Sequence, residues 1–289
     1  MAWSLGAQPG CNGAILSDLK DFTGKAAIVT GATQGLGEMT ARLLVERGLS
    51  HLIVTGRDEP RGAAITEDLR SSGCDAHFVG ADLENPNACE SVISEARKRF
   101  HKVNVLVNAA GLTSRGTIYD TSLELWDRLM AVNLRAPFIL TQGCVNWMRE
   151  TGTVGSIVNI ISTSAYGGQP FLTPYSTSKG GLATFTKNVA YAVVRHRIRV
   201  NGLMLGWMDT PGEDTIQREY HTNDQDWIEE AEATRPFGRL IKTDEAARAI
   251  AWLASDESGL MTGALIDFDQ SVIGGGDAPI PGPDEPGIK

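Results

Sequence analysis

Short runs of apolar, largely β-branched residues recur along this chain, and longer segments with helical periodicity separate them. Runs without a polar face are typical of strands buried on both sides, and strands that alternate with helices form parallel sheets. The alternation predicts an α/β protein whose doubly wound parallel sheet carries helices on both faces. The predicted strands are Ala26 to Thr30, Leu52 to Thr55, His77 to Gly80, Val103 to Val107, Ile157 to Ile161, Ile198 to Leu205 and Ala264 to Phe268.

The pattern contains no internal repeat and no linker, so we expect a single domain over residues 21–275 of the 289. Residues 1–20 form an N-terminal arm in this interpretation, and residues 276–289, rich in glycine and proline, form a C-terminal tail. The stretch from Met1 to Ser17 carries no basic residue. We therefore expect neither a secretory nor a transit peptide.

The balance of charge is acidic, with a formal net charge of -9. This argues against nucleic acid or an anionic membrane as a partner, and no apolar run is long enough to span a bilayer. Cys11, Cys74, Cys89 and Cys144 have no metal-binding spacing. We therefore expect reduced thiols, a cytoplasmic location and no metal site.

The first predicted strand runs directly into a glycine-rich turn, Thr30-Gly31-Ala32-Thr33-Gln34-Gly35-Leu36-Gly37, and an amphipathic helix follows. Glycines at such a turn let the backbone approach a pyrophosphate, and the helix N-terminus stabilises the phosphate charge. The glycine spacing differs from the usual dinucleotide fingerprint, and a tight turn without a ligand is the alternative. The strand before it and the helix after it favour nucleotide binding.

The second predicted strand ends in Gly56-Arg57-Asp58, which bears on the choice of dinucleotide. An acidic residue at this point binds a ribose 2′-hydroxyl, whereas an arginine accommodates a 2′-phosphate. Arg57 therefore favours NADP(H) over NAD(H), while Asp58 and the neutral Gln34 argue the other way. The alternative is that Arg57 is an exposed side chain without a ligand.

The third and fourth predicted strands also end in residues suited to a ligand. Asp82, before Leu83, is placed to meet an adenine edge, although an aspartate at such a junction often only caps a helix or closes a turn. The fourth strand closes in Asn108-Ala109-Ala110-Gly111, whose small side chains leave room for a cofactor.

Residues from Gly155 to Lys179 carry the groups suited to proton transfer. Ser162 follows the fifth strand, and Pro174 marks the start of a helix on which Tyr175 and Lys179 lie one turn apart. A free tyrosine titrates near pH 10, and a neighbouring ammonium favours its phenolate, so we expect Lys179 to lower the pKa of Tyr175. The alternative is an ordinary surface pair.

Two further segments complete the predicted site. Residues 122–148 are expected to be mainly helical, with Asn133 on the apolar face. Pro137, four residues later, has no N–H to bond to the backbone carbonyl of Asn133. The polar insert from Gly206 to about Arg235 contains several aromatic residues, and we interpret residues 207–240 as a substrate lid. Its many acidic residues are expected to cover a solvated helix face.

Taken in order, several of these motifs resemble the short-chain dehydrogenase/reductase family in its single-domain, Rossmann-type form. The resemblance covers Asp21 to Gly275. It rests on Thr30-Gly31-x-x-x-Gly35-x-Gly37, Asn108-Ala-Ala-Gly111, Asn133, Ser162 and Tyr175-x-x-x-Lys179. The interval between Ser162 and Tyr175 is the one that the family usually shows.

The resemblance implies a catalytic group of Ser162, Tyr175 and Lys179, with Asn133 positioning a proton-relay water. It implies that Lys179 also binds the nicotinamide ribose, that Thr210 binds the carboxamide, and that the protein is a homodimer or homotetramer. The expected cofactor-binding residues are Gly31, Thr33, Gln34, Gly35, Leu36, Gly37, Arg57, Asp82, Leu83, Asn108, Ala109, Gly111, Tyr175, Lys179 and Thr210.

Three departures from the family pattern touch cofactor-side or interface loops. Leu205-Gly206 stands where Pro-Gly is usual, Phe268-Asp269-Gln270-Ser271 stands where Asp-Gly-Gly is common, and the N-terminal arm is longer. The leading interpretation is an oxidoreductase that interconverts a secondary alcohol and a ketone, with a polyol or sugar or a cyclic or aryl ketone as substrate. A dinucleotide-binding sensor without turnover is the alternative from another class, and reduction of an imine or activated double bond is a third.

Overall fold

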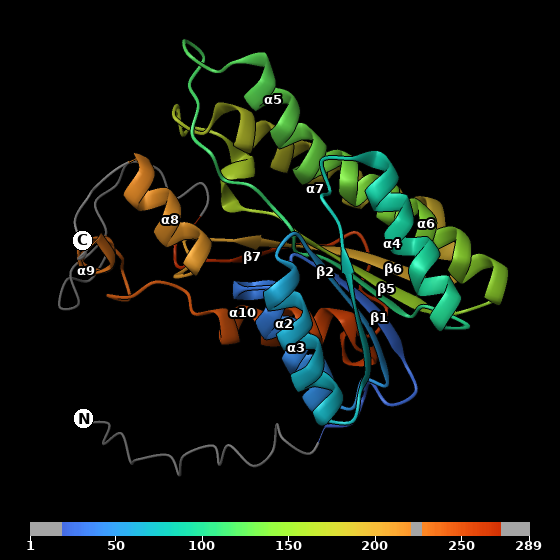
Figure 1. Cartoon of the computed structure of the whole chain (residues 1–289). Coiled ribbons are helices and arrows are strands. Elements are labelled where there is room, and N and C mark those ends of the chain that lie inside the picture. Colours follow the sequence, from blue (N-terminus) through green and yellow to red (C-terminus); the bar gives the residue numbers. More distant parts are fainter. Residues whose placement is uncertain (1–18, 221–226, 273–289) are drawn as a thin grey trace, which may run out of the picture.

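The computed structural model describes residues 19–220 and 227–272, where seven strands form one parallel sheet (Figure 1). The strand order is β3-β2-β1-β4-β5-β6-β7. The fold class predicted from the alternating runs, a Rossmann-type sheet in a single domain, is confirmed. The strands are β1 (Ala26–Thr30), β2 (His51–Gly56), β3 (Asp75–Gly80), β4 (Val105–Asn108), β5 (Gly155–Ile160), β6 (Ile198–Leu205) and β7 (Leu265–Phe268).

The winding of the sheet reverses beside β1. The chain moves outward from β1 through β2 to β3, then returns to place β4 on the other side of β1. Val29 of β1 is in register with Val54 of β2 and with Val107 of β4. A crevice opens outside the carboxyl ends of strands at such a reversal, so the topology itself provides a ligand site here.

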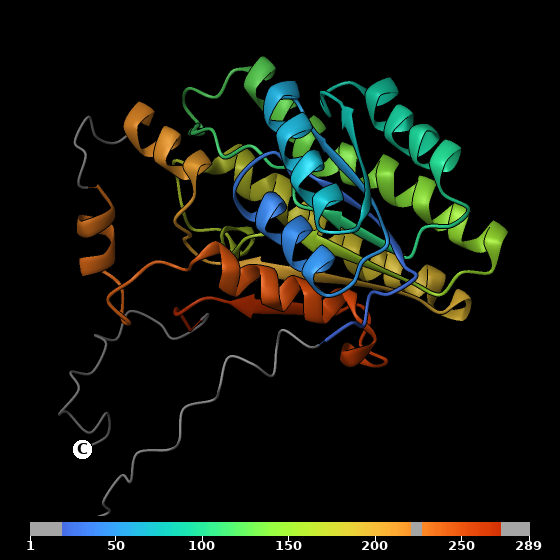
Figure 2. The ribbon, with the colours of Figure 1, turned by 60° about the horizontal axis from the view of Figure 1, so that its bottom comes forward.

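Helices cover both faces of the sheet, as Figures 1 and 2 show. One face carries α2, α3 and α10, and α10 packs against α2. The other face carries α4, α6 and α7. The bounds are α2 (Gly35–Glu46), α3 (Glu59–Ser71), α4 (Pro86–Arg99), α5 (Leu123–Met130), α6 (Ala136–Thr151), α7 (Thr173–Val193) and α10 (Thr243–Ala254).

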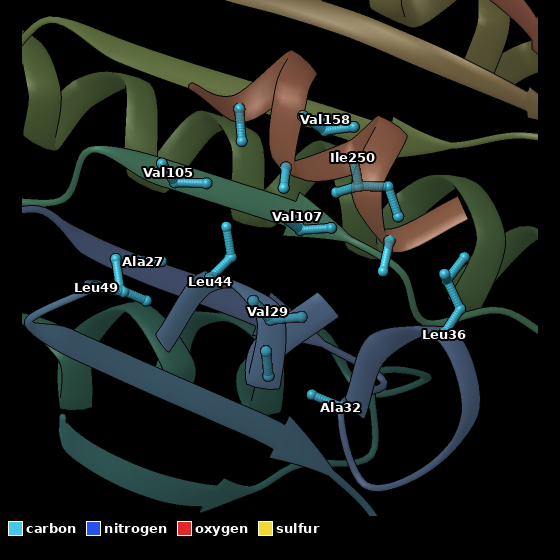
Figure 3. Close-up of a cluster of buried hydrophobic side chains, with 14 of the residues drawn as sticks. Ala27, Val29, Ala32, Leu36, Leu44, Leu49, Val105, Val107, Val158 and Ile250 are labelled. Carbon is cyan, nitrogen blue, oxygen red and sulfur yellow. The ribbon is translucent and has the colours of Figure 1, made fainter. Parts of the chain in front are cut away.

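The alternation of side chains along β1 divides the core into two clusters. Ala27 and Val29 point to the face of α2 and α10, where they meet Leu44 and Ile250 (Figure 3). Ile28 points to the opposite face, among side chains of α4 and α6. Every residue of β1 is buried, as expected for a strand covered on both faces.

The segment over residues 122–148 is helical but not continuous. A π-helical turn, Ala131–Arg135, separates α5 from α6, and the N–H of Ala136 bonds to the carbonyl of Ala131. Pro137 follows directly and has no N–H for the carbonyl of Asn133, so the regular bonding pattern cannot continue through this point. The backbone donor that Pro137 was expected to remove is thus missing at a π-helical turn, a form that the sequence analysis did not predict.

The insert after β6, interpreted above as a substrate lid, contains two helices. It forms α8 (Pro211–Tyr220) and α9 (Trp227–Ala233). The rings of Trp207 and Trp227 stack at a centroid distance of 6.0 Å, and Met208 pairs with Ile241 in an isolated parallel bridge.

The predicted N-terminal arm lies almost wholly outside the described residues, and the predicted C-terminal tail lies wholly outside them. None of the described helices is long and apolar enough to cross a membrane.

Candidate active site

A cavity of about 780 Å³ opens at the carboxyl ends of the strands, where the sheet topology places a ligand site. Its wall comes from the loops that follow all seven strands. The structure therefore brings together residues as far apart in the chain as Gly31 and Ser271, about 240 positions. The predicted site residues that line it are Gly31, Thr33, Gln34, Gly35, Leu36, Arg57, Asp82, Leu83, Ala109, Gly111, Ser162, Tyr175, Lys179 and Thr210.

Ser162 and Tyr175 meet in this cavity. Ser162 begins the short 3-10 helix Thr163–Tyr166 after β5, and its hydroxyl accepts a hydrogen bond from the N–H of Ser164 at 3.1 Å. Tyr175 lies on the first turn of α7, close enough to the Ser162 hydroxyl for that group to lower its pKa. Both side chains are almost fully buried. Two hydroxyl groups thus share one point of the cavity wall.

The expectation that Lys179 lowers the pKa of Tyr175 is wrong in this structure. Burial raises the pKa of Tyr175 to about 12, and the Glu213 carboxylate raises it further, against the hydrogen bond to Ser162 and the charge of Arg115. The Lys179 ammonium donates to the carbonyl of Ile160 at 2.8 Å and lies 5.8 Å from the centre of the Tyr175 ring. At neutral pH the phenol is therefore protonated.

Lys179 and Asn133 approach each other at Gly111. A Cβ atom on this glycine would lie 3.5 Å from Nζ of Lys179 and 3.6 Å from Oδ1 of Asn133. Burial lowers the pKa of Lys179 to about 8. Asn133 is buried behind the cavity wall, where it bonds to the N–H and carbonyl of Leu112 at 2.8 and 2.9 Å and to the Ser178 hydroxyl at 3.0 Å.

The glycine-rich turn fits a dinucleotide pyrophosphate. Gly31 has a φ of 63°, and a Cβ there would lie 2.7 Å from the Cα of Ala110, so only glycine is accommodated. Gly35 also has a positive φ, and Gln34 makes no side-chain cap to the first turn of α2. The first N–H groups of this helix are therefore available to an anion. Gly37 lies behind the turn, against the carbonyl of Gly31.

The end of β2 brings two arginines to the same rim. Arg57 lines the cavity and is exposed. Asp58 does not pair with it: its carboxylate caps α3 by accepting from the N–H of Arg61 at 2.9 Å, and it lies 3.4 Å from Nε of Arg61. Arg61 in turn donates to Oε1 of Gln34 at 2.7 Å. The charge of Asp58 is thus already engaged, and Arg61 is a cation that the sequence did not single out.

Asp82 and Asn108 occupy different layers of the site. Asp82 lines the cavity and also closes a turn, because its carboxylate accepts from the N–H of Glu84 at 3.1 Å. Asn108 is buried beneath the cavity, where its amide donates to Asn159 at 2.8 Å. Thr30, not counted as a site residue, accepts from the N–H groups of residues 109 and 110 at 3.0 Å each.

The substrate end of the cavity contains a charged pair that the sequence did not indicate. Arg115, between β4 and α5, lies 3.4 Å from Glu213 on α8. The two residues are 98 positions apart, and neither belongs to a motif, so only their charges were visible in the sequence. Trp207, Gln217 and Arg235 line the same end.

Comparison with known proteins identifies the family of this fold and site. A family model described as "Enoyl-(Acyl carrier protein) reductase" matches residues 31–271. A protein of Thermotoga maritima named as an uncharacterized oxidoreductase is 34% identical over 85% of this chain and 94% of its own. The cis-4-hydroxycyclohexanecarboxylate dehydrogenase of Sinomonas cyclohexanicum is 31% identical over 86% and 96%.

A solved structure agrees with these relatives. The crystal structure of a variant of actinorhodin polyketide ketoreductase with NADPH has a TM-score of 0.80 and 30% identity, and the similarity covers 85% of this chain and 96% of that one. The named relatives are oxidoreductases, so the protein is an enzyme and the interpretation as a sensor without turnover is not supported. The chain belongs to the short-chain dehydrogenase/reductase family of nicotinamide dinucleotide-dependent oxidoreductases.

Proposed function

We propose that the protein interconverts a secondary alcohol and a ketone with NADP(H) as the cofactor. The observation that carries this proposal is the shared position of the Ser162 and Tyr175 hydroxyls in a cavity that also contains Lys179. Two O–H groups at one point suit a single carbonyl or alcohol oxygen. A nicotinamide bound in this cavity would exchange a hydride with the carbon that carries this oxygen.

Tyr175 is the proton donor in this proposal, and Ser162 stabilises the oxygen by hydrogen bonding. A tyrosine with a pKa of about 12 holds its proton at neutral pH, which suits it to donate to the oxygen of a ketone under reduction. Lys179, whose pKa is about 8, would bind ribose hydroxyls through the same ammonium that now donates to Ile160. Asn133 holds the wall beside Lys179 and would position a relay water there.

NADP(H) is favoured because the rim beside β2 carries Arg57 and Arg61, while Asp58 is engaged with α3 and Arg61. A guanidinium gives a charge-assisted contact to a 2′-phosphate. The solved relative described with NADPH agrees with this choice.

Reduction of an activated double bond is the second candidate, because the matching family model is described as an enoyl reductase. The paired hydroxyls favour a carbonyl, since both groups aim at one oxygen. The names of two relatives, the cis-4-hydroxycyclohexanecarboxylate dehydrogenase and the polyketide ketoreductase, refer to hydroxyl or keto groups.

We further propose that the protein is a homodimer or homotetramer in the cytoplasm. Support for assembly comes from exposed large apolar side chains on and beside α5 and α7. Leu123 is 81% exposed and Tyr191 is 87% exposed. Such patches on a folded chain are typical of interfaces.

The test of the proposed reaction is a panel of ketones, secondary alcohols and enoyl thioesters, each assayed with NAD(H) and NADP(H) by nicotinamide absorbance. Turnover of ketones or alcohols supports the proposal. Turnover of enoyl thioesters alone would assign the second candidate instead.

A further inference from the structure

Glu213 is an acidic residue of the insert that faces the cavity. It lies on the first turn of α8, its N–H donates to the Thr210 hydroxyl at 3.1 Å, and its side chain is only 14% exposed. The expectation that acidic residues of the insert cover a solvated helix face is therefore wrong for Glu213. It holds for Glu219 on the same helix, which is exposed.

One oxygen of the Glu213 carboxylate is fully engaged. Oε1 accepts from Nε1 of Trp207 at 3.0 Å, from Nε2 of Gln217 at 2.6 Å and from Nη2 of Arg115 at 3.4 Å. These donors come from the loop after β6, from α8 and from the loop after β4. Together they fix the orientation of the carboxylate in the cavity wall.

The other oxygen, Oε2, receives no hydrogen bond within residues 19–220 and 227–272. A carboxylate has about four acceptor sites in total, so about half of its capacity is unused. Among the described residues, Oε2 is not one of the fully buried side-chain atoms that lack a partner, so it is open to the cavity that Glu213 lines. A molecule bound in the cavity is placed to supply that donor.

The surrounding charges favour a neutral donor over an anionic group. Arg115 donates to the carbonyl of Thr113 and to Glu213, and its guanidinium lies 5.7 Å from the centre of the Phe171 ring. Its charge is therefore balanced by Glu213. The negative charges of Glu213 and Asp269 and the positive charges of Arg115 and Arg235 all line the cavity, so these four side chains leave no net charge to attract a substrate carboxylate.

We propose that Glu213 accepts a hydrogen bond from a hydroxyl group of the substrate, and that the substrate is a hydroxylated ketone or the matching polyol. The inference rests on the proposed ketone and alcohol chemistry and selects one of the substrate classes left open above. An unsubstituted cyclic or aryl ketone that fills the cavity would displace water from Oε2 without supplying a donor, which is unfavourable for a charged acceptor. Sites built to bind a substrate hydroxyl discriminate strongly against analogues that lack it.

The test compares three kinds of ketone on one ring: cyclohexanone, its 2-, 3- and 4-hydroxy derivatives, and their methyl ethers. The ethers accept hydrogen bonds but cannot donate them. For the wild type we expect kcat/KM for at least one hydroxyketone to exceed that of its ether by roughly tenfold or more, by the usual strength of a hydrogen bond to a charged group.

Glu213→Gln is the decisive variant because it keeps the size of the side chain. The amide oxygen of the glutamine would replace Oε1 and accept from the same three donors. The NH₂ group would then occupy the position of Oε2. An acceptor thus becomes a donor, so the preference for hydroxyketone over ether should fall by roughly tenfold and approach or pass equality. Glu219→Gln, with the same change of charge on the same helix, should leave the preference unchanged.

Equal use of hydroxyketones and their ethers by the wild type would overturn the inference, and so would a preference that Glu213→Gln does not alter. A preference for 4-oxocyclohexanecarboxylate over every hydroxyketone would also overturn it, because it would show that this end of the cavity binds an anionic group through Arg115. In these cases ketone reduction stands. Absence of turnover with every ketone and alcohol, with both cofactors, would overturn the proposed function and this inference together.

Discussion

The cofactor end and the substrate end of the cavity are built from different parts of the chain. At the cofactor end, the wall is largely backbone: the turn of Gly31 and Gly35 and the N-terminus of α2. At the substrate end, it consists of side chains such as Trp207 and Glu213 from the insert after β6, held by hydrogen bonds and an ion pair. Backbone sites depend on local geometry, whereas side-chain sites depend on how distant segments pack.

The proposed catalytic residues lie between these two ends. Ser162 and Tyr175 lie where β5 and α7 meet, and Glu213 of the substrate end raises the pKa of Tyr175 while Arg115 lowers it. Despite this influence on Tyr175, different residues form the three regions, so changing each region should mainly affect a different quantity: turnover at the centre, cofactor choice at one end and substrate choice at the other. The following predictions test that separation, from the largest effect to the smallest.

Tyr175→Phe should separate chemistry from both ends of the cavity. The substitution keeps the ring in its buried position and removes only the hydroxyl. We expect kcat to fall by roughly 10²–10⁴-fold, the range for loss of a positioned acid or base, with cofactor binding nearly intact. Steady-state kinetics and a fluorescence titration with NADPH measure the two quantities. A variant with nearly wild-type kcat on any good substrate would refute the role of Tyr175.

Lys179→Met should reveal what the buried ammonium does to stability. The pKa of Lys179 is about 8 in the folded protein, below its ordinary 10.5, so burial of the charge opposes folding below about pH 8. As pH rises from 8 to 10.5, the folded protein releases this proton while the unfolded chain retains it, and stability increases. Between pH 8 and 10.5, the free energy of unfolding of the wild type should therefore rise by about 3 kcal/mol more than that of the variant.

The measurement is urea unfolding of both proteins at pH 7.5 and at pH 10.5. For each protein, the free energy of unfolding at pH 7.5 is subtracted from that at pH 10.5. This subtraction cancels the change in packing that methionine introduces, because that change is the same at both pH values. Parallel pH dependence of the two proteins would mean that Lys179 titrates normally.

Arg57→Ala should act on the cofactor end alone. Loss of a charge-assisted bond to a 2′-phosphate is worth roughly 1.5–3 kcal/mol, so the preference for NADP(H) over NAD(H) should fall by roughly ten- to a hundredfold. The ratio of kcat/KM for the two cofactors measures it, and the ratio for hydroxyketone over methyl ether should stay constant. If the wild type uses NAD(H) equally well or better, the assignment of Arg57 is wrong.

Asp58→Asn should have the smallest effect. Asparagine caps helices about as well as aspartate, so α3 should keep its N-terminus. Because the carboxylate is already engaged by Arg61, its removal should change the cofactor preference by less than about threefold. A large increase in the preference for NADP(H) would show that Asp58 repels the phosphate.

The sequence predicted the fold because burial leaves a strong local signal. Strands covered on both faces need apolar residues throughout, and β1 and β6 match the predicted bounds. The start of α3 at Glu59 depends on the Asp58 carboxylate, which accepts from the N–H of Arg61. Pro137 indicated the missing donor at Asn133, but the π-helical turn Ala131–Arg135 was not predicted.

The error on Tyr175 has a similar cause. Spacing on a helix correctly predicted that Tyr175 and Lys179 lie one turn apart on α7. It could not predict that the Lys179 ammonium would bond to Ile160, 19 positions earlier, or how deeply the phenol would be buried. The sign of a pKa shift depends on the balance of burial and charge, and that balance belongs to the packed structure.

The sequence by itself determined the order of strands and helices, the glycine-rich turn and the identity of the groups at the centre of the cavity. Each of these follows from residues close together in the chain. The tertiary structure alone decided that Arg115 meets Glu213 across 98 positions, that Asp58 pairs with Arg61 and not with Arg57, and that Oε2 of Glu213 receives no hydrogen bond from the described part of the chain. Such contacts form only when separate loops pack at the same edge of the sheet, because their energies depend on distance in space.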